Sequence, residues 1–498
     1  HERFENDCNP REGRVVKVKK GEVKMQLTAK AKYSYGIGAL GKDLVYGIVG
    51  TYLMIYFTDT IGLAPAFVGT LFLIARIWDT VNDPMMGMVV DNTRTKWGKF
   101  RPWILIGTII NAIVLFFLFK KPDLDGLPLY AYFSVMYILW GMTYTIMDIP
   151  YWSMIPSLTQ DKAEREKVAV IPRIFASIGG LTIGTFGLTF VAKLGQGNDV
   201  KGYESLAFII AVIFIVSSLI TCINVKEPST KTADKTTKKA ERVTLKQTFK
   251  IIGQNDQLKV FIGVVLCMNL MLQLLGGMAL YYFKYATGNE GMFKIYNGFA
   301  GFAEIGGLLL FPILAQKIGR QKLFKVGCFV PVIGLIGLLV SGIWAPDNAL
   351  LVILSALLVR GGGGFVLAST TVMLADVVDY GEYKLGTRNE SIIFSCQTLL
   401  VKSASAFSGW AIGVGLQMMG YVANQEQSAG TIMGMRSLMT IAPIIFIVLC
   451  FAIYKKYYKL NGDFHEEVLN ELEARNNLKE LEARHHSGVE LKGAAVQA

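Results

Sequence analysis

Twelve apolar runs of roughly 20 residues each dominate this sequence and limit what it can fold into. A bilayer core about 30 Å thick needs roughly that length for one helical crossing. The runs lack the alternation of polar and apolar residues that marks a membrane β-barrel. We therefore predict an all-α integral membrane protein with spans near 35–58, 65–90, 102–119, 128–153, 168–193, 205–224, 257–284, 293–315, 323–343, 349–378, 391–419 and 435–456.

Charged residues are few and unevenly placed. They make up 18% of the 498 residues against 52% hydrophobic, a composition that excludes a disordered chain and an ordinary soluble surface. Lys and Arg total 50 against 38 Asp and Glu, a net charge of +12, and the excess falls in alternate loops such as 94–101, 162–167 and 317–325. Because basic loops stay inside, we predict a multi-pass membrane protein with both termini cytoplasmic. The excess favours anionic lipid as a partner and predicts no nucleic-acid partner.

A polar, basic interruption near 224–255 divides the runs six and six. Basic turns with a glycine, 91–101 and 316–322, follow the second and the eighth run, as the repeated halves of a secondary transporter would have. The alternative is that the two turns are unrelated and are both basic only because basic loops stay on the cytoplasmic side. The predicted organisation is a cytoplasmic N-terminal tail 1–33, an N-terminal six-helix bundle 34–224, a cytoplasmic linker 225–256, a C-terminal six-helix bundle 257–456 and a cytoplasmic C-terminal tail 457–498.

Both tails carry further signals. Residues 1–24 have no apolar core of a cleavable signal peptide, and Met25 is a candidate natural start with 1–24 as a candidate non-native extension. After Asp463, a charged helix with Val468 and Leu472 on one side is expected to lie on the membrane surface or on the helical body. A cytoplasmic regulatory protein that docks on the inner loops is a candidate partner, and the sequence carries no signal for an oligomeric state.

The distribution of reactive side chains argues against catalysis. All four histidines lie in the tails, which excludes a His-ligated metal or a Ser/His/Asp triad in the membrane. No Walker-type or dinucleotide glycine pattern is present either, so we expect no enzyme and no cofactor. A membrane-embedded transferase that uses paired aspartates with a divalent metal is the alternative from another class, and a lipid-carrying or sensor-like relative of the transporters is a second.

Ionisable residues inside the apolar runs are the candidate functional groups, because each costs about 2.5 to 3.5 kcal/mol to insert. In the second run Arg76, Asp79, Asn82 and Asp83 are spaced three, four or seven apart and share one helix stripe. With Thr145 and Asp148 of the fourth run, the acids and Asn82 supply only hard oxygens, which favours an alkali cation over zinc or copper. The alternative is that the acids neutralise basic residues such as Arg76 in structural ion pairs.

A sugar requires paired hydrogen bonds and an aromatic face. Carboxylates can each accept two hydroxyls, basic side chains can donate, and aromatic rings can stack on the sugar. The candidates are Lys42, Asp43, Tyr144, Asp148, Trp152 and Arg173. By residue type alone, this set could equally bind an amino acid or a carboxylic acid.

Several longer runs carry a family resemblance: Tyr35–Asp43, Arg76–Pro84, Trp97–Trp103, Trp140–Pro150 and Asp379–Lys384. They resemble the glycoside-pentoside-hexuronide:cation symporters, and among these the carriers of melibiose. The resemblance extends from about Met25 to Asp463 and implies the major-facilitator architecture.

Position by position, the resemblance implies cation ligands at Asp79, Asn82, Asp83, Thr145 and Asp148. It implies sugar contacts at Lys42, Asp43, Asp148, Trp152 and Arg173, with Tyr144, Thr398 and Lys402 as weaker assignments. The chain departs from the melibiose-type pattern at Phe365–Ala368, where such carriers have a Trp, and at Gly50, where they have a Tyr. Both departures concern the sugar and leave the cation ligands unchanged.

The function predicted from these observations is cation-coupled symport of a galactoside, most simply melibiose or another α-galactoside, by alternating access. The coupling cation is Na⁺, with Li⁺ or H⁺ as alternatives. A β-galactoside, a pentoside or a hexuronide is the alternative substrate.

Overall fold

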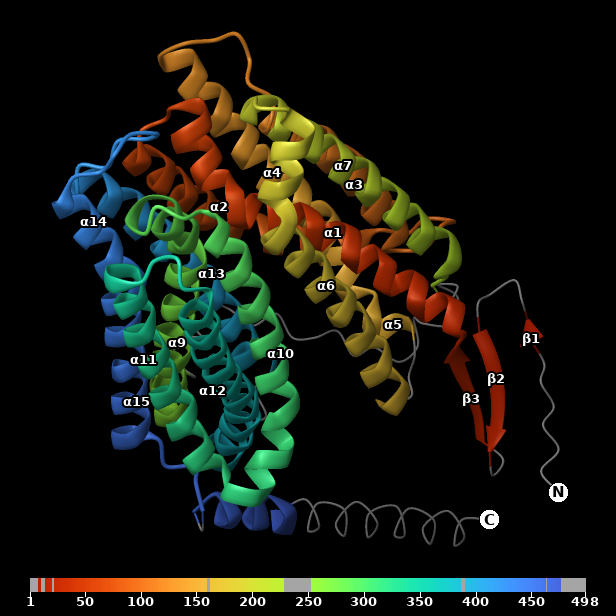
Figure 1. Cartoon of the computed structure of the whole chain (residues 1–498). Helices are drawn as coiled ribbons and strands as arrows, with labels where there is room; N and C mark the ends of the chain where they lie inside the picture. Colours follow the sequence, from red (N-terminus) through yellow and green to blue (C-terminus); the bar gives the residue numbers. More distant parts are fainter. Residues whose placement is uncertain are drawn as a thin grey trace, which may run out of the picture.

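The computed structural model describes residues 8–9, 14–19, 22–158, 162–227, 252–386, 390–462 and 464–475 (Figure 1). The first half contains α1 Ala29–Ile55, η1 Tyr56–Ile61, α2 Pro65–Asn92, α3 Arg101–Leu118, α4 Leu127–Ser153, α5 Ile155–Leu158, α6 Lys162–Gly195 and α7 Asp199–Asn224. The second contains α9 Asp256–Tyr281, η2 Tyr282–Ala286, α10 Gly291–Ile318, α11 Arg320–Trp344, α12 Ala349–Leu385, α13 Glu390–Met418, α14 Ala429–Arg436, η3 Ser437–Ile441 and α15 Ala442–Tyr457.

The long helices form two bundles, one from α1 to α7 and one from α9 to α15 (Figure 1). In the first bundle α1 packs on α6 and α7, and α3 packs on α4 and α7. In the second bundle α12 packs on α10 and α11, and α9 packs on α13 and α15. With η1, η2 and η3 taken as continuations of their helices, the described residues form six long helices in each bundle, so the predicted fold class is confirmed.

Ten of the described helical segments are long and apolar enough to cross a membrane. The two long helices below that hydropathy are α2 and α4. Helix α2 contains Arg76, Asp79 and Asp83, and α4 is rich in Tyr and Trp. These two helices are also the ones that carry the candidate cation ligands.

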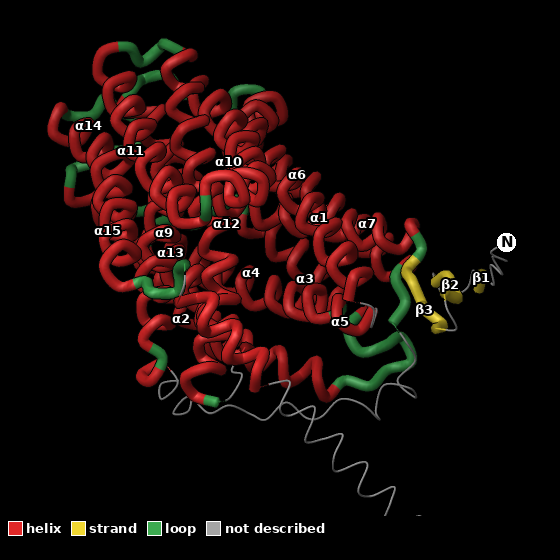
Figure 2. The backbone as a smooth tube through the Cα atoms, turned by 90° about the horizontal axis from the view of Figure 1, so that it is seen from below, coloured by secondary structure: helices red, strands yellow, loops and turns green. Residues whose placement is uncertain are grey.

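The N-terminal segment differs from the prediction in two ways. Strands β1 Cys8–Asn9, β2 Arg14–Lys19 and β3 Glu22–Leu27 form an antiparallel sheet in the order β1-β2-β3, which the sequence analysis did not foresee. Figure 2 places this sheet beside the helical body. Helix α1 begins at Ala29, before the predicted boundary at 34, because the Thr28 hydroxyl caps it by accepting the Ala31 N–H over 3.2 Å. The predicted linker lies largely outside the described residues.

The first helices of the two halves end alike. Helix α1 continues into the π-helical turn η1, and α9 continues into η2, and each turn begins with Tyr-Phe. Tyr56 donates to the Phe119 carbonyl over 2.8 Å, and Tyr282 donates to the Leu338 carbonyl over 2.7 Å. Each tyrosine therefore ties the first helix of its half to the third, which supports the repeat inferred from the two basic turns.

The halves meet at the end of the molecule where α1 and α9 finish, which we term the closed end (residues 55–72, 181–189, 281–301 and 409–424). Helix α2 crosses α13 there at a pair of glycines: a Cβ on Gly413 would lie 2.4 Å from the Pro65 carbonyl oxygen and 2.9 Å from Gly69 Cα. Nearby, α6 packs on α10. The opposite end carries the beginning of α1 and the end of α15.

Replacing Gly413 by Val should separate α2 from α13, because no side-chain atom fits between the two backbones at that point. Overpacking of this kind typically costs about 1–3 kcal/mol. We expect a lower melting temperature of the purified protein. The control is Gly87→Ala on α2, where a Cβ meets nothing within 4 Å and no destabilisation of that size is expected; equal melting temperatures for both variants would contradict the close packing.

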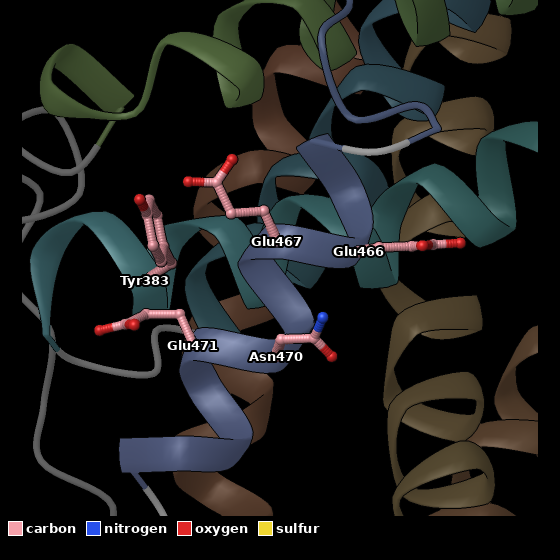
Figure 3. Close-up of a pocket in the computed structure, with 5 residues that line it drawn as sticks. All are labelled: Tyr383, Glu466, Glu467, Asn470 and Glu471. Atoms are coloured by element: carbon pink, nitrogen blue, oxygen red, sulfur yellow. The ribbon is translucent and has the colours of Figure 1, made fainter.

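The helix formed by residues 464–475 docks on the end of α12. Val468 and Leu472 are buried, and Nη1 of Arg475 donates to the Tyr383 carbonyl over 3.0 Å. This agrees with the predicted location on the helical body. Figure 3 shows the shallow pocket at this contact, lined by Tyr383, Glu466, Glu467, Asn470 and Glu471.

Candidate functional site

The polar stripe of α2 faces the protein interior. Asp79 is buried and Asp83 is half-buried, whereas Ile77 and Val81 on the other side are 61% and 52% exposed. The exposed face is apolar and suits lipid, so the stripe predicted from spacing is confirmed. Pro84 lacks an N–H and therefore cannot donate to the Thr80 carbonyl one turn earlier, which leaves a backbone acceptor next to the stripe.

Lys42 gathers the candidate sugar residues of α1 and α4 around its ammonium group. Its Nζ lies 2.9 Å from Oδ1 of Asp148 and 3.2 Å from Oδ2 of Asp43. It also donates to the Tyr144 hydroxyl over 3.3 Å and lies 5.0 Å from the centre of the Trp152 ring. Nε1 of Trp152 donates to Oδ1 of Asp148 over 3.1 Å. We term these five residues the Lys42 cluster.

The Lys42 cluster combines the groups that hold a polyol. Its carboxylates are acceptors, its ammonium and indole N–H are donors, and the Trp152 ring offers a flat apolar face. Lys42 is 4% exposed, whereas Asp43, Asp148 and Trp152 are half-buried. The lysine therefore holds the acids in place, and the partly exposed groups are those that a ligand could reach.

The candidate cation ligands form a second network on α2, α4 and α13. Thr145 donates to Oδ1 of Asp83 over 3.0 Å, and Lys402 binds Oδ2 of the same carboxylate. Nη1 of Arg76 pairs with Oδ2 of Asp79 over 2.9 Å. Within the part of the chain that the structure describes, no three His, Cys, Asp or Glu side chains form a group that could hold a metal ion. The predicted ligands lie on adjoining helices but do not converge as a finished cage.

Each acid of the candidate cation site has a basic partner. This is what the alternative of structural ion pairs predicted. The pairs nevertheless leave an unbalanced charge. Four carboxylates against three cationic side chains give a net charge of minus one for Asp43, Asp79, Asp83 and Asp148 with Lys42, Arg76 and Lys402. The buried Nδ2 of Asn82 also has no hydrogen-bond partner among the described residues. This N–H is a donor and needs an acceptor, so it does not itself bind a cation. The net negative charge leaves room for one monovalent cation on the oxygens of the set.

Three predicted sugar residues are not among the residues that the described contacts of Lys42 bring together. Arg173 of α6 and Thr398 of α13 are exposed, and no described contact joins the Arg173 guanidinium to Lys42. Lys402 binds Asp83 and is therefore part of the network of the candidate cation ligands, as a partner of one of them. Its partner could have been suspected, since a lysine inside an apolar run needs an acid, but several acids were available.

Sequence reasoning also missed what positions α4. Nδ2 of Asn111 on α3 donates to the Trp140 carbonyl over 2.9 Å and to the Thr143 hydroxyl over 2.8 Å. Gly141 leaves space beside Asp79, because a Cβ there would lie 3.4 Å from Oδ1 of that acid. The hydrogen bonds of Asn111 hold α4 against α3 just before the turn that holds Tyr144, Thr145 and Asp148.

Two bundles of membrane-crossing helices around a buried polar centre define a membrane transporter rather than an enzyme. Residues 34–462 match the family described as MFS/sugar transport protein, and the chain belongs to that family. The alternative of a membrane-embedded transferase is therefore set aside.

Relatives cover nearly the whole chain. It is 31% identical to the raffinose carrier protein of Pediococcus pentosaceus over 88% of this chain and 70% of that one. It is 30% identical to the isoprimeverose transporter of Lactiplantibacillus pentosus, over 89% and 91% of the two chains. With the inner membrane symporter YicJ of Escherichia coli (strain K12) it shares 29% identity over 90% and 95%.

Solved structures support the fold. A bacterial homologue of the lysosomal transporter Spinster, inward-facing and unoccupied, matches with a TM-score of 0.64 over 85% of this chain and 95% of that one, at 13% identity. The nucleoside transporter NupG matches with a TM-score of 0.60 over 86% and 99% of the two chains, at 15% identity. These similarities concern the fold alone.

Proposed function

We propose that this protein is a cation-coupled sugar symporter of the bacterial inner membrane that takes up a galactoside, with melibiose or another α-galactoside as the first candidate and Na⁺ as the cation. Li⁺ and H⁺ are the alternative cations. The family and the named sugar carriers and symporters among the relatives support sugar symport. A β-galactoside, a pentoside or a hexuronide is the runner-up substrate, and the isoprimeverose transporter favours a pentose-containing glycoside among these.

The observation that carries the proposal is the position of two residues three apart on α4. Asp148 belongs to the Lys42 cluster, and Thr145 belongs to the network of Asp83 and Lys402. Residues three apart on a helix share one face, so the proposed sugar and cation sites adjoin along α4. Because both sites share α4, a ligand that moves α4 at one site also moves the residues of the other site.

The coupling follows from the charge balance. A cation that enters beside Asp83 competes with Lys402 for the same carboxylate and neutralises the remaining negative charge. With Asp148 as a further ligand, the cation would orient this carboxylate toward the sugar hydroxyls. Each ligand favours the arrangement that the other needs, and by linkage the benefit must be reciprocal.

The predicted topology with cytoplasmic termini makes the closed end the outer end. The contacts at that end would then seal the pocket from outside, as in an inward-facing state of alternating access. The same two bundles would rock about α2–α13 and α6–α10 to release this contact and close the cytoplasmic side.

Counterflow in vesicles tests the proposal, with radiolabelled melibiose, raffinose, lactose, isoprimeverose and glucuronide, each with and without Na⁺. A Na⁺-dependent exchange of α-galactosides is expected. If only another glycoside is exchanged, that glycoside replaces the α-galactosides as the proposed substrate class. Absence of exchange with every sugar would reject sugar symport.

Replacing Asp43 by Asn should abolish sugar binding, because the Lys42 cluster loses an acceptor and the charge that holds its lysine. Loss of charge-assisted hydrogen bonds costs about 1.5–3 kcal/mol each. Binding is measured by calorimetry on the purified variant. The control is Asp91→Asn, an exposed acid on α2 that pairs with Lys99; wild-type affinity in the Asp43 variant would place the pocket elsewhere.

A further inference from the structure

A charged pair in the second half takes no part in either network described above. Nη1 of Arg360 on α12 donates to Oε2 of Glu304 on α10 over 2.9 Å. The Glu304 side chain is 30% exposed and the Arg360 side chain 19%. Both residues lie well inside helices that are apolar enough to cross a membrane. Because a charge that faces lipid is strongly disfavoured, the exposed part of the pair should face a water-filled space between the bundles.

The contacts between α6 and α10 show which way Glu304 points. A Cβ on Gly301 would lie 2.5 Å from the Leu181 side chain, and the Asn297 amide lies 2.4 Å from a Cβ on Gly184. Positions 297, 301 and 304 follow each other by four and three and share one face of α10. Glu304 therefore lies on the face turned toward the first half, one turn beyond the contact with Leu181.

The same contacts give its depth. One turn beyond Leu181 corresponds to residues 177–178 of α6. Helix α1 reaches this level at the Lys42 cluster, because Gly179 of α6 approaches the Leu40 carbonyl, where a Cβ would lie 2.8 Å from the oxygen. Glu304 and the Lys42 cluster are thus at similar depth on opposite halves.

The chemistry of the pair suits a neutral polyol. Glu304 offers acceptors and Arg360 offers further donors, and its buried Nε has no hydrogen-bond partner among the described residues. Because the two charges cancel, a carboxylate ligand would gain little from Arg360 beside Glu304. Sugar hydroxyls can bind to both partners without changing the net charge.

We propose that Glu304 and Arg360 form a subsite for the second glycosyl unit of the transported sugar, opposite the first unit at the Lys42 cluster. The inference rests on the proposed sugar transport and adds that the second half selects disaccharides over monosaccharides. The pair then contacts the substrate from α10 and α12 while the first half holds the terminal sugar.

The test compares a disaccharide with its terminal monosaccharide. Galactose with melibiose and xylose with isoprimeverose are the two probe pairs, titrated by calorimetry into wild type, Glu304→Gln and Arg360→Gln in saturating Na⁺. Loss of one charged hydrogen-bonding group should weaken disaccharide binding roughly tenfold. Monosaccharide affinity should stay within about twofold of wild type. The control is Lys384→Gln, which removes another α12 cation that pairs with an α9 acid, Asp256.

The outcomes separate the subsite from a structural ion pair. If the pair only joins α10 to α12, the double Gln variant regains disaccharide affinity, or both affinities fall together; either result overturns the subsite. Unchanged disaccharide affinity in both single variants overturns it as well. For a single variant that fails to fold, Glu304→Asp and Arg360→Lys keep the charge but move the hydrogen-bonding atoms, so disaccharide affinity should fall while monosaccharide affinity stays unchanged; equal changes in both affinities overturn the subsite. A wild type that binds neither of these disaccharides, nor raffinose, lactose or a glucuronide, rejects the proposed function itself.

Discussion

Replacing Asp83 by Asn is expected to make sugar affinity independent of Na⁺. Asp83 is the carboxylate shared by Thr145 and Lys402, and its loss removes the negative charge that a cation would balance. Coupling between two ligands is typically about 1–3 kcal/mol, or roughly 5- to 150-fold in affinity. In the variant this factor should fall to about one. Calorimetric titration of melibiose with and without Na⁺, Li⁺ and acid measures it directly.

The matched control for this variant is Asp91→Asn, which removes an exposed acid from the same helix. Its Na⁺ stimulation should equal that of wild type. Some sugar affinity should survive in the Asp83 variant, because the Lys42 cluster does not contain this residue. Full Na⁺ stimulation after loss of Asp83 would place the cation elsewhere.

Replacing Asp59 by Asn is expected to release the closed end. The Asp59 carboxylate is 4% exposed and accepts from Lys284 over 2.7 Å and from the Tyr285 and Tyr421 hydroxyls of the second half. The Nδ2 of Asn424 donates to its backbone carbonyl over 2.7 Å. Removing one partner of a buried ion pair costs about 3–5 kcal/mol, since the other charge is left unpaired. A loss of about 3 kcal/mol shifts the balance between two conformations roughly 100-fold.

Labelling of an introduced cysteine measures this shift. Ile61 lies at the closed end and is 7% exposed. A cysteine introduced there (Ile61→Cys) should react with a membrane-impermeant maleimide much faster after Asp59→Asn. The control is Asp347→Asn, an acid whose described hydrogen bond, from Asn289, lies within the second half. Equal labelling rates in the two variants would show that Asp59 does not hold the halves together.

The membrane helices could be predicted with little error because each must bury its backbone groups and present about 20 apolar residues to lipid. The stripe of Asp79 and Asp83 on α2 was also predictable, since helical spacing alone decides which side chains share a face. The grouping of Lys42, Asp43 and Asp148 came from residue type together with the resemblance, and their contacts agree with it. The strands before α1 were missed, because attention to apolar runs gives no weight to short polar segments.

Partners between distant helices could not be predicted. Lys402 binds Asp83 across 319 positions of sequence, and Glu304 meets Arg360 across 56. A single charged residue in an apolar run indicates that a partner of opposite charge is needed. Several residues in the sequence could be that partner, so the sequence does not identify which one it is.

The sequence by itself determined the number of crossings, the polar stripes on them and the chemistry of the groups inside the membrane, because these depend on composition and helical period. Only the tertiary structure decided which charges pair, that Arg173 and Thr398 lie outside the Lys42 cluster, and that the halves meet at the closed end. The reason is physical: pairing depends on how helices tilt and cross, and those angles follow from side-chain packing over the whole interface, such as the approach of Gly69 to Gly413.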